Sequence, residues 1–306
     1  MTLEVGLATW MSDVNRVIAR CKQLEVNSVT MRVASMQGFE KNRAPDRAAL
    51  REMQGRLADA GITIAALSQW FGDDAALVVD PASHRREVDG MLQTLDVQGE
   101  LGISRQLHYV DVPEPADPAE DDLYWSGMLE IFREIIPQAA KTGVRIANHG
   151  IWRCLPTSLR ESALADGVTA ADYRAYRPEE WGGPYLVRTS EHVHRIVEAV
   201  PGDYHGYALC TGLYITGGDP VAEIERFSGK INFVQIRDLA GMWPDAQEVF
   251  LGTGDLDFSA ILKALIAAGY SGFLHPEHLG DPRHADEDIE ADATMLLKTW
   301  VEQASV

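Results

Sequence analysis

Side chains able to bind a metal recur at the ends of short apolar runs in the second half of the chain. His149, Cys210 and Glu277 each lie near the end of such a run, and Gln235 lies in the run between the last two. Imidazole, thiolate and carboxylate together suit Zn²⁺, Fe²⁺ or Mn²⁺, and an amide oxygen is a weaker donor. If these runs are neighbouring strands, the four residues predict a site for one divalent ion.

Proton transfer and anion binding have candidates close to these ligands. His278 follows Glu277 directly, and His108 ends an earlier apolar run. Imidazole titrates near neutral pH, so either histidine could act as a general acid or base. Arg237 could hold a substrate carboxylate bidentately. We therefore predict catalytic roles for His278, His108 and Arg237.

Large polar and aromatic residues end the remaining runs or follow them, as expected for a substrate-binding rim. The predicted substrate contacts are Trp10, Arg32, Trp70, Trp152 and Arg237. Each residue also has a purely structural interpretation. A buried cysteine often only packs, tryptophans often pack at a rim, and Glu277 could simply pair with an arginine.

The elements that must position these residues alternate along the chain. Eight runs are apolar or β-branched and end in polar residues, which is typical of parallel strands covered on both faces. They span residues 3–10, 28–35, 62–71, 103–112, 144–150, 205–215, 231–239 and 272–278.

Helical patterns separate the runs. Apolar residues at helical spacing, early Pro or Asp residues and terminal glycines mark the clearest of them. These are Asp13–Leu24, Pro45–Ala60, Leu123–Thr142 and Phe258–Ala268, the last with Asp257 as its N-cap.

Eight strands alternating with helices predict an α/β fold, a single (β/α)₈ TIM barrel over residues 1–306. An open doubly wound sheet is the alternative, but no GxGxxG loop follows any run. Residues 151–188 lack clear periodicity, and we interpret them as a lid-like insertion over the barrel mouth. In such a barrel the carboxyl ends of the strands, where the candidate residues lie, form the active face.

Composition limits the partners. The 306 residues carry a formal charge of −19, which disfavours nucleic acid and anionic membranes. Three cysteines cannot form a disulfide framework, and the N-terminus does not read as a signal peptide. We therefore expect a cytoplasmic protein that acts on a small molecule and can form a homo-oligomer.

Two segments resemble the bacterial mannonate dehydratases of the xylose isomerase-like barrel superfamily. They are GYALCTGLYITGGDPVAEIERFSGKINFVQIRDL at 206–239 and GYSGFLHPEH at 269–278. Cys210 matches a metal ligand in a Cys-x-Gly motif, His149 matches a metal-binding histidine, and Glu277 falls at a Pro-Asp-His ending. The resemblance implies a divalent cofactor, most of all Mn²⁺, with Zn²⁺, Fe²⁺ or Co²⁺ as alternatives, and a sugar acid or sugar as substrate.

The sequence departs from that family at several positions. Gln235 stands where the dehydratases carry a histidine, and Gly150, Ile151 and Trp152 replace an acidic run. The chain is also shorter than a typical dehydratase.

The leading hypothesis is a metal-dependent sugar-acid lyase that abstracts a proton beside a carbonyl or carboxylate, with the enediolate stabilised by the metal. A sugar isomerase or epimerase on the same barrel is an alternative, since only the fate of the intermediate differs. A metal-free carbohydrate-binding barrel without catalysis is another, favoured by Gln235 and the tryptophans. A metal-dependent endonuclease is disfavoured by the negative charge.

Overall fold

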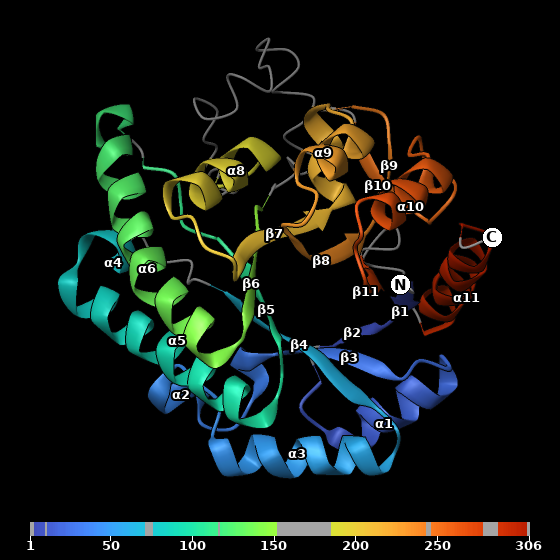
Figure 1. Ribbon diagram of the computed structural model, residues 1–306, viewed down its shortest axis with the longest axis horizontal. Coiled ribbons are helices and arrows are strands. Elements are labelled where there is room, and N and C mark those ends of the chain that lie inside the picture. Colours follow the sequence, from blue (N-terminus) through green and yellow to red (C-terminus); the bar gives the residue numbers. More distant parts are fainter. Residues whose placement is uncertain are drawn as a thin grey trace.

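A nearly closed sheet of parallel strands forms the centre of the molecule, and helices surround it (Figure 1). The computed structural model describes residues 3–9, 11–70, 76–115, 117–151, 185–242, 246–277 and 287–304. In spatial order the strands are β1 (Leu3–Val5), β11 (Gly272–Pro276), β8 (Ile231–Ile236), β7 (His205–Cys210), β6 (Arg145–His149), β5 (Arg105–Tyr109), β4 (Thr63–Trp70), β3 (Ser28–Arg32) and β2 (Leu7–Thr9). This arrangement confirms the predicted barrel and excludes the open doubly wound sheet.

The first predicted strand closes the sheet by pairing with both of its edges. It is divided at Gly6 into β1, which pairs with β11, and β2, which pairs with β3. At the break the Gly6 N–H donates to the carbonyl of Leu274 at 3.0 Å. A β-carbon on Gly6 would lie only 2.5 Å from Ser28 Oγ and 2.8 Å from the His275 ring. Closure therefore depends on a residue without a side chain.

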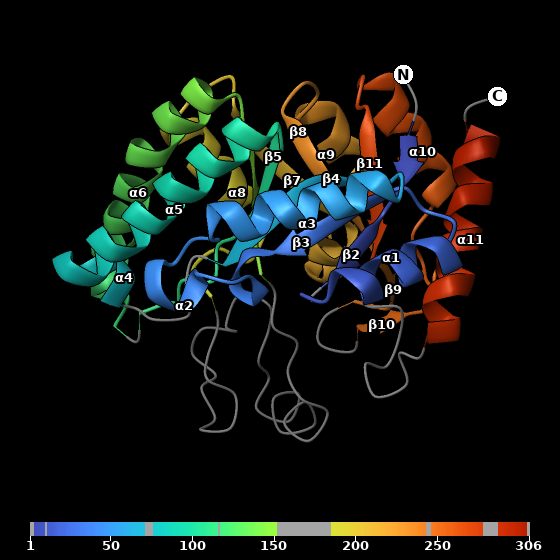
Figure 2. The same ribbon diagram turned by 90° about the horizontal axis from the view of Figure 1, so that it is seen from below.

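Helices pack against the outside of the sheet (Figure 2). They are α1 (Val14–Gln23), α2 (Phe39–Asn42), α3 (Arg47–Asp59), α4 (Ala76–Val79), α5 (Pro81–Leu101), α6 (Asp121–Thr142), α8 (Ser190–Ala199), α9 (Pro220–Arg226), α10 (Phe258–Ala267) and α11 (Glu287–Ala304). Within the described ranges no helix is both long and apolar enough to cross a membrane.

Local capping chemistry fixes several helix boundaries. Asp257 is the N-cap of α10, as predicted, and its carboxylate accepts from the Ala260 N–H. Asp13 caps α1 in the same way, so that helix begins one residue later than expected. The helix predicted from Pro45 begins at Arg47, because Asp46 rather than Pro45 is its N-cap.

The sixth apolar run, 205–215, extends beyond the end of its strand. Strand β7 ends at Cys210, and Thr211–Thr216 form a 3₁₀ helix whose apolar residues Leu213 and Tyr214 are buried. A short antiparallel hairpin of β9 (Asp238–Ala240) and β10 (Gln247–Val249) follows β8. The sequence patterns do not predict this hairpin.

Most of the segment interpreted as a lid, residues 152–184, lies outside the described residues. The two ends of the segment are joined to each other, because the Ile151 N–H donates to Val187 O at 2.8 Å. The second end is also joined to the chain after β5, because the Leu186 N–H donates to Val112 O at 2.8 Å. The lid and the single-domain organisation stay predictions.

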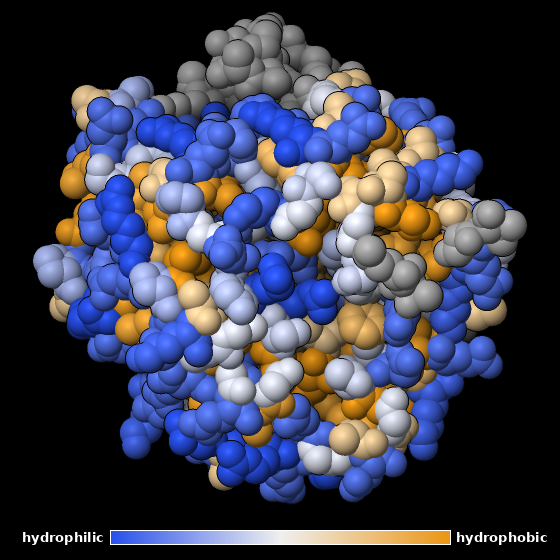
Figure 3. Space-filling view, in the orientation of Figure 1, coloured by the Kyte–Doolittle hydropathy of each residue, from blue (hydrophilic) through white to orange (hydrophobic). Residues whose placement is uncertain are grey.

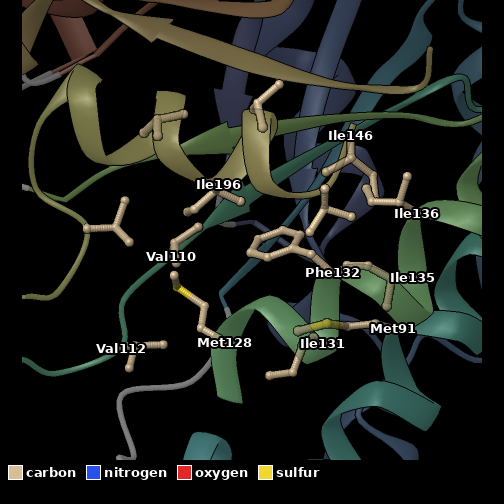
Figure 4. Packing of buried hydrophobic residues seen from close by; sticks show 14 of the residues in the cluster. Met91, Val110, Val112, Met128, Ile131, Phe132, Ile135, Ile136, Ile146 and Ile196 are labelled. Atoms are coloured by element: carbon tan, nitrogen blue, oxygen red, sulfur yellow. The ribbon is translucent and has the colours of Figure 1, made fainter. Parts of the chain in front are cut away.

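The largest hydrophobic cluster lies between the sheet and helices α5, α6 and α8 (Figure 4). Phe132 and Ile135 of α6 are fully buried there against Met91 of α5 and Ile146 of β6. Burial on this scale, at about 25 cal/mol per Å² of apolar surface, holds the helices in place around the strands.

Two histidines are built into the buried polar interior in their neutral form. His205 Nδ1 donates to Val200 O at 2.6 Å, and its Nε2 lies 2.6 Å from the Asn148 amide nitrogen. His275 Nε2 lies 3.3 Å from Thr30 Oγ1, and its ring stacks on Phe233. Burial lowers the pKa of both histidines to about 4.

We predict that Gly6→Ala destabilises the protein by about 1–3 kcal/mol, because the new methyl group overlaps Ser28 and His275. Urea unfolding monitored by circular dichroism measures the loss. Gly55→Ala is the matched control, since no atom lies within 4 Å of its added β-carbon and it is inside α3. That variant should be neutral or up to about 1 kcal/mol more stable. Equal stability of Gly6→Ala and wild type would contradict the packing argument.

The neutral histidines predict acid sensitivity. Their folded pKa is depressed, so between pH 6.5 and about 4 the unfolded chain binds more protons than the folded one. Each histidine should therefore lower stability by up to about 1.4 kcal/mol per pH unit as the pH falls through this window. Urea unfolding at several pH values measures the slope. His205→Gln should reduce it, and a slope unchanged by that substitution would show that His205 does not contribute.

Candidate active site

Seven of the predicted site residues lie near the carboxyl ends of β3, β4, β6, β7, β8 and β11. Going around the barrel from β3 they are Arg32, Trp70, His149, Cys210, Gln235, Arg237 and Glu277. Most of them lie in two connected groups. The ionic group consists of Glu277, Arg237 and Gln235, and the aromatic row consists of Trp70 and His149 on either end of a contact series through Tyr109.

The ionic group is organised by the carboxylate of Glu277. Arg237 Nη2 donates to Glu277 Oε2 at 2.6 Å, and Arg237 Nε donates to the same oxygen at 3.2 Å. Gln235 Nε2 also donates to Oε2, at 2.7 Å, and the Tyr109 hydroxyl lies 3.4 Å from Oε1. Glu277 thus pairs with an arginine, as its purely structural interpretation predicted.

Arg237 bridges two carboxylates. Its Nη1 donates to Glu248 of β10 at 3.1 Å, while its other nitrogens hold Glu277. Only 13% of the side chain is exposed, and burial alone would lower its pKa. Cys210, Glu277 and Glu248 nevertheless hold that pKa well above the ordinary value, so the guanidinium stays charged.

The backbone of Arg237 is fixed by the residue after Cys210. Thr211 Oγ1 accepts from the Arg237 N–H at 2.7 Å and donates to the Arg237 carbonyl at 2.5 Å. One hydroxyl therefore ties the end of β7 to the end of β8.

Tyr109 joins the ionic group to the aromatic row. Its hydroxyl accepts from Gln235 Nε2 at 2.7 Å, and its ring stacks on Trp70 with centroids 4.4 Å apart. The centroid of the His149 ring lies 4.9 Å from that of Tyr109, and the Arg32 guanidinium lies 5.3 Å from the Trp70 ring. Burial, and then Glu277, raises the pKa of Tyr109 well above its usual value, so the hydroxyl stays protonated.

Cys210 is a protonated thiol in this setting. It is 1% exposed, pairs in register with Gln235, and interacts electrostatically with Arg237 and Glu277. Burial raises its pKa to about 11 although Arg237 opposes the shift. Metal binding would require loss of this proton, because the thiolate is the ligand.

The predicted metal ligands fit a divalent ion in donor type. Gln235 Oε1 is buried and has no hydrogen-bond partner in the described part of the chain, so this donor atom is not used by the protein. Within that same part, however, no three His, Cys, Asp or Glu side chains gather closely enough to hold a metal ion. Arg237 and the Gln235 nitrogen hold Glu277 Oε2 in this arrangement.

The structure does not bring His108 to the other site residues. It is fully buried on the helix side of β5, where its ring contacts Phe132 of α6, whereas Tyr109 next to it faces the site. Burial, and then His205, lowers the pKa of His108 to about 3. The remaining predicted residues, Trp10, Trp152 and His278, lie outside the described residues.

Sequence reasoning assigned no role to Tyr109 and Glu248. The signal for Tyr109 was available, because successive residues of a strand point to opposite sides and His108 and Tyr109 cannot both face the mouth. Glu248 had no such signal, since it reaches Arg237 only through the unexpected hairpin.

We predict that Arg237→Met destabilises the protein by about 1–3 kcal/mol, because it leaves the partly buried Glu277 and Glu248 without their cation. Urea unfolding measures the change. The double variant Arg237→Met with Glu277→Leu should recover a large part of the loss. Additive losses in the double variant would mean that the two side chains are not energetically coupled.

Comparisons with known proteins agree with this architecture. Residues 18–299 match the family model described as xylose isomerase-like TIM barrel. Mannonate dehydratase from Thermotoga neapolitana is 28% identical over 138 residues, which cover 39% of this chain and 37% of that enzyme. The match therefore spans well under half the length of this curated relative.

Solved structures share the fold over the whole chain. Mannonate dehydratase from Streptococcus suis serotype 2 superposes with a TM-score of 0.74 at 16% identity, covering 99% of this chain and 93% of that one. An L-ribulose 3-epimerase superposes with a TM-score of 0.68 at 19% identity, covering 100% and 96%. At these identities the likeness shows the fold alone. The family match over residues 18–299 establishes that the chain belongs to the xylose isomerase-like TIM barrel family.

Proposed function

We propose that this barrel is an enzyme that acts on a sugar acid or a sugar by removing a proton beside a carboxylate or carbonyl. The observation that carries the proposal is the partly buried carboxylate of Glu277, held by Arg237 and Gln235 next to the aromatic row of Tyr109 and Trp70. Charged groups fixed in a buried site beside flat apolar rings suit a polyol with an ionised end.

Within this class we propose dehydration, that is, lyase activity. The segments around His149 and Cys210 resemble the metal-ligand motifs of the mannonate dehydratases, and proteins of that name are among the relatives. Isomerisation or epimerisation is the alternative within the same class, because an epimerase shares the fold. We also propose the cytoplasm as the location, on the grounds of composition.

We propose that His149, Cys210, Gln235 through Oε1, and Glu277 would hold a divalent ion, with Mn²⁺ as the first candidate and Zn²⁺, Fe²⁺ and Co²⁺ as alternatives. Such an ion would act as a Lewis acid toward substrate oxygens. The ion would compete with Arg237 for Glu277, since that carboxylate is already paired.

The other residues have separable roles in this proposal. Arg32, whose guanidinium lies over the Trp70 ring, is the residue proposed to bind the substrate carboxylate. Trp70 and Tyr109 contact the apolar face of the sugar. Arg237 is a positioning residue that orients Glu277. His278 remains the proposed general acid or base, on the evidence of its position next to Glu277 in the sequence.

The metal prediction is tested by elemental analysis of the purified protein after incubation with Mn²⁺ and gel filtration. Wild type should retain about one ion per chain, and Cys210→Ala should lose most of it, because a rigid strand cannot supply another ligand. Cys21→Ala is the matched control, since this second buried cysteine lies in α1 away from the site. Equal metal content in wild type and Cys210→Ala would refute the proposed ligand set.

The activity prediction is tested by a screen of aldonates and uronates with added Mn²⁺, read by 2-keto acid formation. Under our proposal His278→Asn lowers turnover at least about a hundredfold and leaves metal content unchanged. Trp70→Ala should instead raise KM, since it removes contact surface. Turnover of His278→Asn within a few fold of wild type would place the base elsewhere.

A metal-free carbohydrate-binding barrel is the second candidate. It is favoured by the contacts of Glu277, because Arg237 and Gln235 already donate hydrogen bonds to the carboxylate that a metal would need. In that case wild type carries no metal, and calorimetry detects sugar binding without product formation.

A further inference from the structure

We propose that the floor of the barrel, opposite the candidate active site, is a binding site for a phosphate group built from Arg105 and Arg145. A pocket of about 240 Å³ opens there, where the strands begin. It is lined by both arginines, by Asn232 near the start of β8, and by Tyr270 and Ser271 before β11.

The two arginines lie directly opposite each other. Arg105 is the first residue of β5 and Arg145 the first of β6, and their α-carbons are partners in the parallel ladder. Side chains in register point to the same side of a sheet, and like charges in that position repel. The arrangement is destabilising by itself and becomes favourable when an anion lies between the two cations.

No carboxylate neutralises either arginine within the described part of the chain. Arg105 Nη2 donates to the carbonyl of Ser271 at 3.0 Å, and Arg145 Nη1 donates to the carbonyl of Asp203 at 3.2 Å. These backbone contacts orient the guanidinium groups but supply no negative charge. The Arg145 guanidinium also lies 5.4 Å from the centre of the Tyr204 ring, and Arg145 is exposed to solvent. On a chain with a net charge of −19, two neighbouring arginines without a carboxylate partner in the described residues are unexpected.

The Arg105 side chain also carries an unused donor. Its Nε is buried and lacks a hydrogen-bond partner among the residues that the structure places. Gly272 makes room for this side chain, because a β-carbon there would lie 3.2 Å from Arg105 Nη2 and 3.0 Å from the Tyr270 hydroxyl. Arg105 is therefore held in a fixed position at the pocket wall.

The space-filling view from the side on which the strands begin shows hydrophilic side chains at the centre of this face, between hydrophobic patches (Figure 3). Paired guanidinium groups present several N–H donors in planar forks, which match the oxygens of phosphate. The pocket has room for free phosphate or for the phosphate end of a small ester.

Calorimetric titration of the whole protein with inorganic phosphate, at fixed ionic strength, tests the site. Wild type should show one saturable site, and Arg105→Gln and Arg145→Gln should each weaken binding at least about tenfold, as expected for losing a charged hydrogen bond. Arg133→Gln is the matched control, since it removes an equal charge from an exposed position on α6. Arg145→Lys keeps the charge but loses the fork, so its binding should be intermediate.

Thermal unfolding gives an independent measurement. Phosphate should raise the Tm of wild type and of Arg133→Gln, and should raise it little in the Arg105 and Arg145 variants. Without phosphate, the glutamine variants should be at least as stable as wild type, because they relieve the repulsion. Absence of saturable binding to wild type, or equal weakening by Arg133→Gln, would overturn the proposal.

The source of the phosphate group is distinguished by repeating the titration with glycerol 3-phosphate. Tighter binding than inorganic phosphate supports a small phosphate ester as the occupant, and weaker binding supports free phosphate. Neither result involves the candidate active site, so failure here leaves the proposed enzymatic function untouched.

Discussion

Closure of the sheet by one interrupted strand is the constraint on which the rest of the molecule depends. Backbone groups at a sheet edge need partners, and residues 3–9 supply them to β11 through β1 and to β3 through β2. Because all pairs in this sheet are parallel, closure places every carboxyl strand end on one side. Residues as far apart in sequence as Arg32 and Glu277 therefore lie on one face of the barrel.

The two ends of the barrel differ in how charge is balanced. At the mouth, Arg237 bridges Glu277 and Glu248, and the neutral partners Gln235 and Tyr109 complete the hydrogen bonds. At the floor, Arg105 and Arg145 each donate to a backbone carbonyl, Arg145 also lies over the Tyr204 ring, and neither has a carboxylate partner among the described residues. A charge removed from water needs a partner, and at the mouth Arg237 has two carboxylates. At the floor Arg145 is exposed to solvent and Arg105 is partly buried, so an anion would enter from solvent and add the negative charge that the described residues around them do not supply.

The barrel could be predicted because its signal is periodic and local. Short apolar runs ending in polar residues gave the strands, and Asp257 marked the start of α10 correctly. The run at 205–215 misled because Leu213 and Tyr214 remain apolar after the strand has ended, being buried by a 3₁₀ turn. Burial alone therefore does not distinguish a strand from the turn that follows it.

The site was predictable in position but not in pairing. Strand ends identified Arg237, Gln235 and Glu277, yet their contacts join residues about 40 positions apart and depend on side-chain orientation. His108 shows the same limit, because a shift of one residue along a strand changes the face on which a side chain lies. Only three-dimensional placement revealed that Tyr109 takes the position facing the site.

The two hydrogen bonds between the Thr211 hydroxyl and the backbone of Arg237 have a kinetic consequence. Both backbone groups of Arg237 are bound to one hydroxyl, so the main chain at this point has little freedom to shift. Any exchange of Glu277 for another anion must then occur by rotation about the side-chain bonds of Arg237. Such rotation needs no opening of the sheet, so the guanidinium can change partners while the barrel wall stays still.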